Sequence, residues 1–445
     1  MITANDQRSW FQQLLAQAGP DLPGSDLAWL AQARDTARQA VSELAIPHRK
    51  QEAWRYTSID GLLKNRFESA ADASAALPAL TVDDCVLPAL DSYRLVLVNG
   101  RCVAHLSSVE ALPAGVTLGS LRTALTSDPG LLATWFGQTA NHTEHVFTAL
   151  NTALVNDGVF IHVANGVALD RPLEVVYVSV TDTDAIMIQP RNLVVLEAGA
   201  SATLVERCIG SGQSPYFHNN LTEIAVGEGA ALHHYRLQDE SRSAYHLSSL
   251  YLSQAGHSHY HGTALAFGGA WARTDYNVSF RHAGAECTLN GLYTAGDKQL
   301  TDLHLNVQHS VPGCASRERF KGILYGRGRA VFDGRILVEK QAQRSDAFLS
   351  NDNLMLTRDA EVDTKPQLEI YANDVKCSHG TTVGQLDPQQ VFYLRSRGID
   401  EAAARRMLCL GFAGEILDSI GVQPLREHVA DKLAQTLNDV VVSKE

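Results

Sequence analysis

Residues 192–206 of the chain read Asn-Leu-Val-Val-Leu-Glu-Ala-Gly-Ala-Ser-Ala-Thr-Leu-Val-Glu, and this stretch decides the fold class. Two short runs, 192–197 and 202–206, flank an Ala-Gly-Ala turn and are rich in Leu and β-branched residues. Alternating side chains in such runs indicate strands with one buried face. This part of the chain is therefore predicted to form sheet rather than helix.

The turn repeats along the chain. Related sequences at 227–230, 254–257 and 282–285 each precede another short strand. The glycines of the four turns stand at positions 199, 229, 256 and 284, which is ~27–30 residues apart and typical of solenoids and other repeat architectures. Because one coil of a β-helix cannot bury its own apolar face, stacked coils share a continuous core. We predict a β-solenoid; a β-sandwich, which also has many short strands at regular spacing, is the alternative.

Periodicity divides the chain into three expected domains: residues 1–146, 147–383 and 384–445. The first mixes helix with short strands. Apolar residues at three- and four-residue steps predict a helix over 26–47, which Ser25 and Asp26 can cap. A strand from Tyr93 runs into an Asn-Gly turn at 99–100, which predicts a hairpin. The second domain is the β-region described above.

The third domain is predicted to contain three short helices. Asp387 and Pro388 start the first, Asp400 caps the second, and Pro424 starts the third. The expected apolar positions are Met407, Leu408, Phe412 and Ile416 in the second helix and Leu425, Val429, Leu433 and Leu437 in the third. These helices either cap an end of the solenoid, which keeps it soluble, or form a platform for a partner. The sequence leaves both open.

Charge and cysteine content narrow the classes of function. The 445 residues include 49 acidic and 37 basic ones and no local run of Lys and Arg, which argues against nucleic-acid binding. Residues 1–8 lack a basic flank leading into an apolar core, so we expect no secretory signal. No apolar stretch approaches the ~18 residues that a membrane span needs. The seven cysteines are scattered singly, which predicts a reducing, cytoplasmic setting.

The sharpest candidate site is the segment 374–380, which contains Cys377 and His379. Thiolate and imidazole suit iron–sulfur clusters and zinc. On an extended segment this spacing places both side chains on one face, and Lys376 would favour the thiolate by its charge. Two ligands are too few for a stable metal site, so further ligands must come from elsewhere, such as another chain. A buried cysteine beside a hydrogen-bonded histidine is the alternative.

A second candidate is the histidine run His257, His259 and His261, with His233 and His234 one repeat earlier. Alternation would point three imidazoles to one side of a strand, with neighbours ~6.5–7 Å apart. An adjacent pair could then share a metal ion. We favour a solvated polar strand face, because structural zinc sites need four ligands.

Paired carboxylates form a third candidate, since Glu361 and Asp363 are expected to share a strand face. In a β-helix such a pair could serve as acid and base of a polysaccharide-cleaving enzyme. No aromatic platform stands beside them, and a solvated acidic strand face is the favoured interpretation.

Longer motifs resemble a known family. Four motifs resemble the signature of the SufB/SufD family of iron–sulfur cluster assembly. They are Ser-Asn-Asp-Asn-Leu-Met-Leu at 350–356, Ala-Glu-Val-Asp-Thr-Lys-Pro-Gln-Leu-Glu-Ile at 360–370, the 374–380 segment, and Phe-Tyr-Leu-Arg-Ser-Arg-Gly-Ile at 392–399. Lys-Gln-Glu-Ala-Trp-Arg-Tyr-Thr at 50–57 resembles the N-terminal motif of the same family. SufB-like members carry His-Glu where this chain has His-Gly, so the resemblance is nearer to the SufD branch.

The resemblance implies a right-handed parallel β-helix between an N-terminal and a C-terminal helical domain, and a scaffold rather than an enzyme. SufD pairs with SufB through the β-helices; the sequence leaves open whether the isolated chain forms a homodimer. The C-terminal helices dock the ATPase SufC, which here would involve Phe392, Tyr393, Arg395 and Arg397. A transient iron–sulfur cluster is shared with SufB, with His379 and its neighbour Cys377 contributing, and none is expected on the isolated chain.

Overall fold

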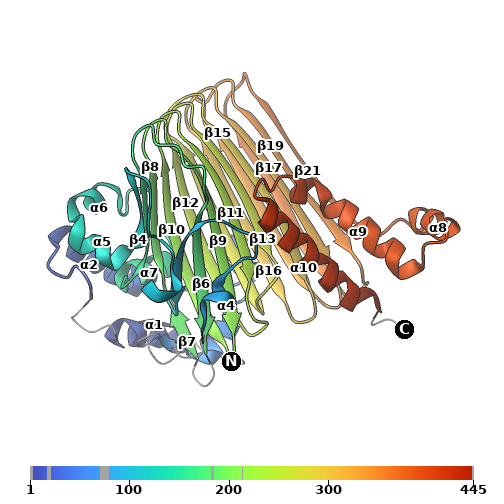
Figure 1. Cartoon of the computed structure of the whole chain (residues 1–445), viewed down its shortest axis with the longest axis horizontal. Helices are drawn as coiled ribbons and strands as arrows, with labels where there is room; N and C mark the ends of the chain where they lie inside the picture. Colours follow the sequence, from blue (N-terminus) through green and yellow to red (C-terminus); the bar gives the residue numbers. More distant parts are fainter. Residues whose placement is uncertain (1–3, 18–21, 71–79, 182–184, 213, 443–445) are drawn as a thin grey trace.

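Two β-sheets face each other along the molecule, and helices pack on the outer face of each sheet (Figure 1). The computed structural model describes residues 4–17, 22–70, 80–181, 185–212 and 214–442. Successive strands alternate between the two sheets, so that the chain winds as a solenoid. Neighbouring strands run parallel, apart from two short antiparallel pairs near the N-terminal end. The predicted mainly β, parallel solenoid is therefore confirmed, and the antiparallel sandwich is excluded.

Sheet A begins at β4 (Val116–Ser120) and ends at β20 (Glu361–Ile370). Between them lie, in order, β5 (Gly158–Val163), β8 (Arg191–Leu196), β10 (Tyr216–Val226), β12 (Tyr245–Gln254), β14 (Trp271–Phe280), β16 (Leu300–His309) and β18 (Arg329–Val338). Two short strands off this path also belong to sheet A: β1 (Glu68–Ser69) and β7 (Ile186–Ile188).

Sheet B begins at the hairpin of β3 (Arg101–Cys102) and β2 (Tyr93–Val98) and ends at β21 (Lys376–Gly384). Between them lie, in order, β6 (Leu173–Val180), β9 (Ser201–Ser211), β11 (Ala231–Asp239), β13 (His259–Ala266), β15 (Glu286–Ala295), β17 (Ala315–Leu324) and β19 (Asp346–Met355). The predicted Asn-Gly turn is confirmed, because Asn99 and Gly100 both have positive φ between β2 and β3.

The repeated Ala-Gly sequences form the tight turns between sheets. Gly199 and Gly284 adopt the left-handed conformation that a glycine reaches without strain. In the turn at 254–257 it is His257 that takes a positive φ, and Gly256 does not. His257 therefore belongs to a turn, and the strand starts two residues later at His259.

Alternate side chains of each strand fill the interior of the solenoid. Leu196, Leu204, Ile224 and Leu232 belong to one continuous core cluster and are at most 1% exposed. Burial of such a side chain contributes ~1.5–3 kcal/mol. Stacked rows of interior residues therefore hold successive coils together.

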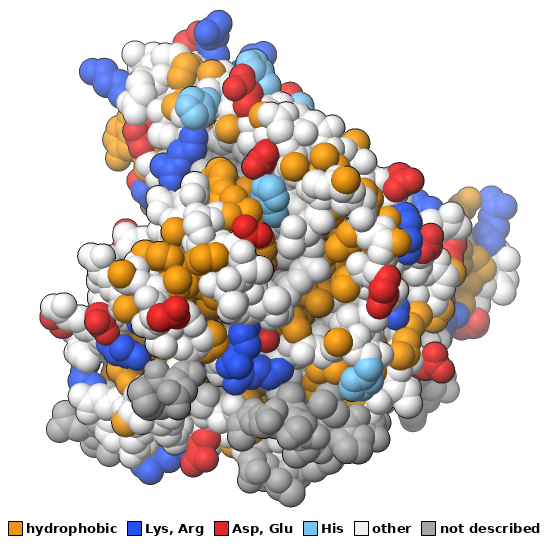
Figure 2. All heavy atoms as spheres, turned by 60° about the vertical axis from the view of Figure 1, so that its left-hand side comes forward, with side chains coloured by type: hydrophobic (Ala, Val, Ile, Leu, Met, Phe, Trp, Pro, Cys, Tyr) orange, Lys and Arg blue, Asp and Glu red, His pale blue; other side chains and the backbone are white. Residues whose placement is uncertain are grey.

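N-terminal helices cover the outer face of sheet A. They are α1 (Ala4–Gln17), α2 (Ala28–Glu43), α3 (Asp60–Asn65), α5 (Leu121–Ser127), α6 (Pro129–Trp135) and α7 (Val146–Ala153). Helix α4 (Val82–Cys85) instead packs against β2 and β6 of sheet B. Phe147 of α7 packs with Phe217 and Trp271 of the sheet. The predicted α2 forms, but its N-cap is Leu27, without a side-chain cap, so the expected capping by Ser25 and Asp26 was wrong. On this side of the molecule Lys and Arg are interspersed with Asp and Glu (Figure 2).

Three C-terminal helices follow the last strand: α8 (Pro388–Ser396), α9 (Glu401–Asp418) and α10 (Gln423–Val442). The side chains of Asp387 and Asp400 cap α8 and α9, as predicted. The predicted stripe of α10 is also confirmed, because its four members are fully buried: Leu425, Val429, Leu433 and Leu437. The stripe of α9 is shifted, since Met407 is 50% exposed while Cys409 and Ala413 are buried.

Helices α9 and α10 lie along the flank of the solenoid and not across its end (Figure 1). Their buried side chains join Tyr235, Leu292 and Ile323 of sheet B in one apolar cluster. Among the described helices, none is both long and apolar enough to cross a membrane.

Candidate functional site

The C-terminal end of the solenoid is open. Strands β20 and β21 stand last in their sheets, so each is paired on one side only within the described part of the chain. Every residue of β18 and β19 is buried or half-buried, whereas nearly every residue of β21 is exposed. Apolar side chains at this end also reach solvent, since Val383 is 52% and Ile370 40% exposed. An uncovered edge of this kind is a template for another strand.

Cys377 and His379 lie on β21 at this open end. Their register partners on β19 are Ala347 and Leu349, both of which point into the core. The two side chains therefore continue the inner wall of sheet B beyond the last covered coil, on one face as predicted. Thr381, two residues further, meets Thr364 of β20 across the interior, with 3.2 Å between their hydroxyl oxygens.

The chemistry of this pair differs from the expectation in one respect. Burial raises the pKa of the half-buried Cys377 thiol, although a backbone hydrogen bond at Ala347 opposes the change. The expected activation by Lys376 is therefore wrong for the chain by itself. Within the described ranges, no third Cys, His, Asp or Glu side chain is close enough to join Cys377 and His379 around one ion.

The N-terminal motif at 50–57 fastens the chain to sheet A near this end. Arg273 lies over the Trp54 ring, 3.9 Å from its centroid, and donates to the Ala53 carbonyl oxygen. Asp302 accepts a 2.6 Å hydrogen bond from Thr57 and pairs with Arg273 at 2.9 Å. Burial opposes the ionisation of Asp302, yet His304 and Arg273 lower its pKa to about 2. The motif thus has a structural role.

Glu361 and Asp363 share the outer face of β20, as predicted, and both pair with one cation. Arg329 lies 3.0 Å from a Glu361 oxygen and 3.7 Å from an Asp363 oxygen. Burial, and next the Glu361 charge, raise the pKa of Asp363. Ion pairing to the preceding coil agrees with an acidic strand face, which was the favoured interpretation.

The histidine run is divided by the structure. His257 lies in a turn, so three imidazoles on one strand face was a wrong expectation. His259 pairs with exposed Glu286 at 3.4 Å, while the His261 ring lies tilted against the His233 ring of the previous coil, with 5.5 Å between ring centroids. These contacts agree with a polar strand face, which was favoured over a shared metal ion.

Helix α8 presents large side chains to solvent. Phe392 is 72% and Tyr393 57% exposed. Arg397 donates to the Tyr393 hydroxyl at 3.1 Å, and Arg395 pairs with Glu401 at 3.3 Å. The helix projects from the body of the molecule (Figure 1). Exposed aromatic and Arg side chains together are typical of protein interfaces.

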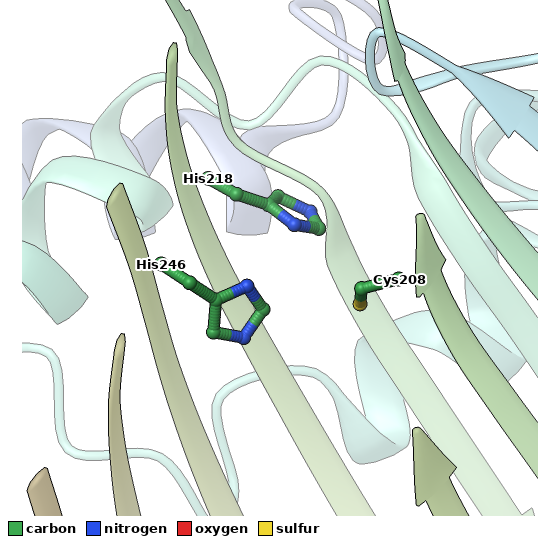
Figure 3. A group of neighbouring side chains, drawn as sticks. All are labelled: Cys208, His218 and His246. Carbon is green, nitrogen blue, oxygen red and sulfur yellow. The ribbon is translucent and has the colours of Figure 1, made fainter. Parts of the chain in front are cut away.

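The structure also brings together three residues that the sequence analysis did not single out. Cys208, His218 and His246 converge inside the solenoid (Figure 3). A signal was available, because His218 and His246 are register partners on adjacent strands and occupy equivalent positions of successive repeats.

Comparison with known proteins agrees with this architecture. The family model of the SufBD core domain of the SUF FeS cluster assembly system matches residues 178–412, and that of the SufBD N-terminal region matches residues 5–175. An iron–sulfur cluster assembly SufBD family protein of Synechocystis is 33% identical over 411 residues, covering 91% of this chain and 90% of the relative.

Two relatives carry the name SufD. The iron–sulfur cluster assembly protein SufD of Escherichia coli is 32% identical over 402 residues, 90% of this chain and 91% of its own. SufD of Bacillus subtilis is 25% identical over 422 residues, 90% of this chain and 92% of its own. The two family models together span nearly the whole chain, and the relatives cover about nine-tenths of it. The chain therefore belongs to the SufBD family of iron–sulfur cluster assembly proteins and is SufD-like.

Proposed function

We propose that the chain is a non-catalytic scaffold subunit of a cytoplasmic SufB–SufC–SufD complex and that its open end docks against the solenoid of SufB. The observation that carries this proposal is the unfinished last coil, which exposes two strand edges and an inner wall on which Val383 and Ile370 reach solvent. A second solenoid can continue both sheets and cover that wall, because each strand edge offers unpaired backbone groups. In the absence of SufB, a second copy of the chain can occupy the same edges.

The nascent cluster forms at this junction, with His379 and Cys377 supplying part of the ligands and SufB the rest. Imidazole and thiolate are suitable iron ligands, and two ligands from one chain leave room for those of a partner. The raised pKa of free Cys377 means that its thiolate forms on metal binding, with release of a proton. The cluster is cargo that passes through the site, so the isolated chain holds none.

SufC docks on α8, and the ATPase activity of the complex belongs to SufC. Phe392 and Tyr393 supply the apolar contact, and Arg395 and Arg397 surround it. Replacing both aromatic residues by Ala should abolish co-purification of SufC while the far-ultraviolet circular dichroism spectrum stays unchanged, because neither ring is buried. SufC binding at wild-type strength would exclude this docking surface.

The cluster site is tested by His379→Ala in the purified three-component complex. The variant should assemble with SufB and SufC but yield markedly less cluster, measured by its visible absorption and by iron and sulfide content. His259→Ala is the matched control, since it removes another exposed imidazole that lies on the outer face of sheet B. Equal cluster yield in His379→Ala and wild type would count decisively against a ligand role.

A further inference from the structure

A cluster of potential metal ligands lies inside the solenoid, several coils from the open end. Cys208 of β9, His218 of β10 and His246 of β12 each point a ligand atom toward the others, and these atoms lie within 4.8 Å of one another (Figure 3). The three residues are 7%, 0% and 2% exposed, respectively. Solvent therefore cannot satisfy their polar atoms.

A carboxylate adjoins the same cluster. Glu240 follows β11, and its Oε2 lies 2.7 Å from Nδ1 of His246 and accepts a 3.0 Å hydrogen bond from Gln238. The other oxygen, Oε1, lies 3.6 Å from Nδ1 of His218, beyond hydrogen-bond distance. A buried carboxylate needs a positive partner.

The hydrogen bonding of this cluster is incomplete. Neither ring nitrogen of His218 has a hydrogen-bond partner, and neither has Oε1 of Glu240, among the described residues. Buried polar atoms in folded proteins are nearly always satisfied. The His218 ring can therefore offer a nitrogen lone pair to a metal ion.

His234, a neighbouring interior histidine, differs from His218 because its hydrogen bonding is complete. Both ring nitrogens of His234 are engaged, Nδ1 with the Tyr260 hydroxyl at 2.9 Å and Nε2 with Glu206 at 2.8 Å. This adjacent network is complete without any further atom. Incomplete bonding thus distinguishes the Cys208–His218–His246 group from this adjacent network.

Space for one more atom adjoins the group. A cavity of about 30 Å³ is lined by Cys208 and His246, among other residues. A cavity of this size has room for a water-sized atom. A single ion can therefore be accommodated with small side-chain movements.

We propose that Cys208, His218 and His246 bind one divalent transition-metal ion of borderline softness, of the Zn²⁺ or Fe²⁺ class, with Glu240 completing the site. A thiolate and two imidazoles are the ligand types that such ions prefer, and a carboxylate makes a fourth for tetrahedral coordination. The thiolate and the carboxylate together neutralise the ion, so the buried complex carries no net charge. Binding releases the thiol proton to solvent.

This site is separate from the proposed cluster junction and does not depend on it. Cys377 and His379 lie on the last strand of sheet B, whereas Cys208 lies on β9, six strands earlier in that sheet's order. The interior ion would be resident and structural, in the middle of the coil stack. Because its ligands are buried, it must enter while the chain folds.

The test supplies the metal during synthesis of the full-length chain. Cells in minimal medium receive Zn²⁺, Fe²⁺ or Co²⁺ singly, and the purified protein is dialysed against chelator before elemental analysis. We expect about one ion per chain. The cobalt form should show the visible bands of tetrahedral Co²⁺ and a near-ultraviolet thiolate-to-cobalt band, and its melting temperature should exceed that of protein made without added metal.

Matched variants locate the ion. Cys208→Ala should abolish the thiolate-to-cobalt band, and His246→Gln should lower the metal content several-fold. Cys287→Ala, which changes another fully buried cysteine of the interior, and the double variant Cys377→Ser with His379→Ala should both keep the wild-type spectrum. If Cys208→Ala fails to fold, X-ray absorption of the cobalt-loaded control variants tests the assignment instead. The cobalt ion should keep one sulfur ligand in the variants that lack Cys377 or Cys287.

Three results would overturn the proposal. Folded wild-type chain that retains no ion from any of the three media would show that the group is only a buried polar cluster. A cobalt band that persists in Cys208→Ala would place the ion elsewhere. A band lost with Cys377 and His379 would assign the metal to the open end.

Discussion

Replacing Glu318 by Gln should remove a large part of the pH dependence of stability. Glu318 lies on β17, is fully buried, and has Leu289 and Leu349 as register partners on the neighbouring strands. Neither oxygen of its carboxyl group has a hydrogen-bond partner among the described residues. Burial raises the pKa of Glu318 to about 8, because the charged form is poorly solvated in the interior.

The sign and size of the effect follow from linkage. In the unfolded chain this carboxyl has its ordinary pKa of 4.5. Between about pH 4.5 and 8 the unfolded state has lost the proton that the folded state keeps, so stability falls as pH rises. Since one pKa unit corresponds to about 1.4 kcal/mol, the free energy of unfolding should fall by about 5 kcal/mol across this range. Outside the range the contribution of Glu318 is constant.

Urea unfolding followed by circular dichroism, between about pH 5 and pH 8.5, measures the effect through the midpoint. The midpoint of wild type should decrease across the range far more than that of Glu318→Gln, so that the variant gains stability relative to wild type as pH rises. Glu286→Gln, which removes an exposed carboxylate from the adjacent strand, should follow the wild-type profile. Parallel profiles for wild type and Glu318→Gln would refute the reasoning, since they would mean that the buried carboxyl group does not keep its proton.

Three further substitutions test other contacts, with the same urea midpoint as the measurement. Leu433→Ala should lower the free energy of unfolding by ~2–5 kcal/mol, because Leu433 is fully buried between α10 and sheet B. Glu223→Ala should lower it by ~3–5 kcal/mol, since this carboxylate pairs with buried Arg191 and accepts three backbone hydrogen bonds from the 137–140 loop. Asp400→Ala should cost ~1 kcal/mol as a lost N-cap of α9, and an unchanged midpoint in any of the three would contradict the assigned contact.

The solenoid could be predicted because its determinant is local and repeated. Each turn must place one residue in a conformation that glycine favours, so the sequence marks the coil boundaries directly. The position of His257 could not be predicted in this way, since the turn at 254–257 places the histidine rather than Gly256 in that conformation. A periodic pattern also does not say which residues of an apolar stripe are the most buried. The exposure of Met407 could therefore not be predicted.

The candidate sites were predictable to different degrees. Strand periodicity placed Cys377 and His379 on one face, because neighbours two apart always share a face. That the face is uncovered depends on where the C-terminal helices pack, and this is decided by outward apolar residues such as Tyr235 and Leu292. Those residues look like ordinary strand positions in the sequence. Predicting the interior group of Cys208 and two histidines required the register between coils. That register becomes evident in the sequence only when the repeats are aligned with one another.

The open end limits what can cover it. Both sheets stop at the same coil, so a partner must meet two parallel edges and the inner wall between them. On the outer face of β20 the charges are already paired within the chain, Glu369 with Arg335 at 2.7 Å and Lys365 with Glu52 at 2.5 Å. A single helix or extended peptide would leave one edge or the inner wall exposed. We infer that the end is built for another solenoid, which is the shape that can satisfy all three surfaces at once.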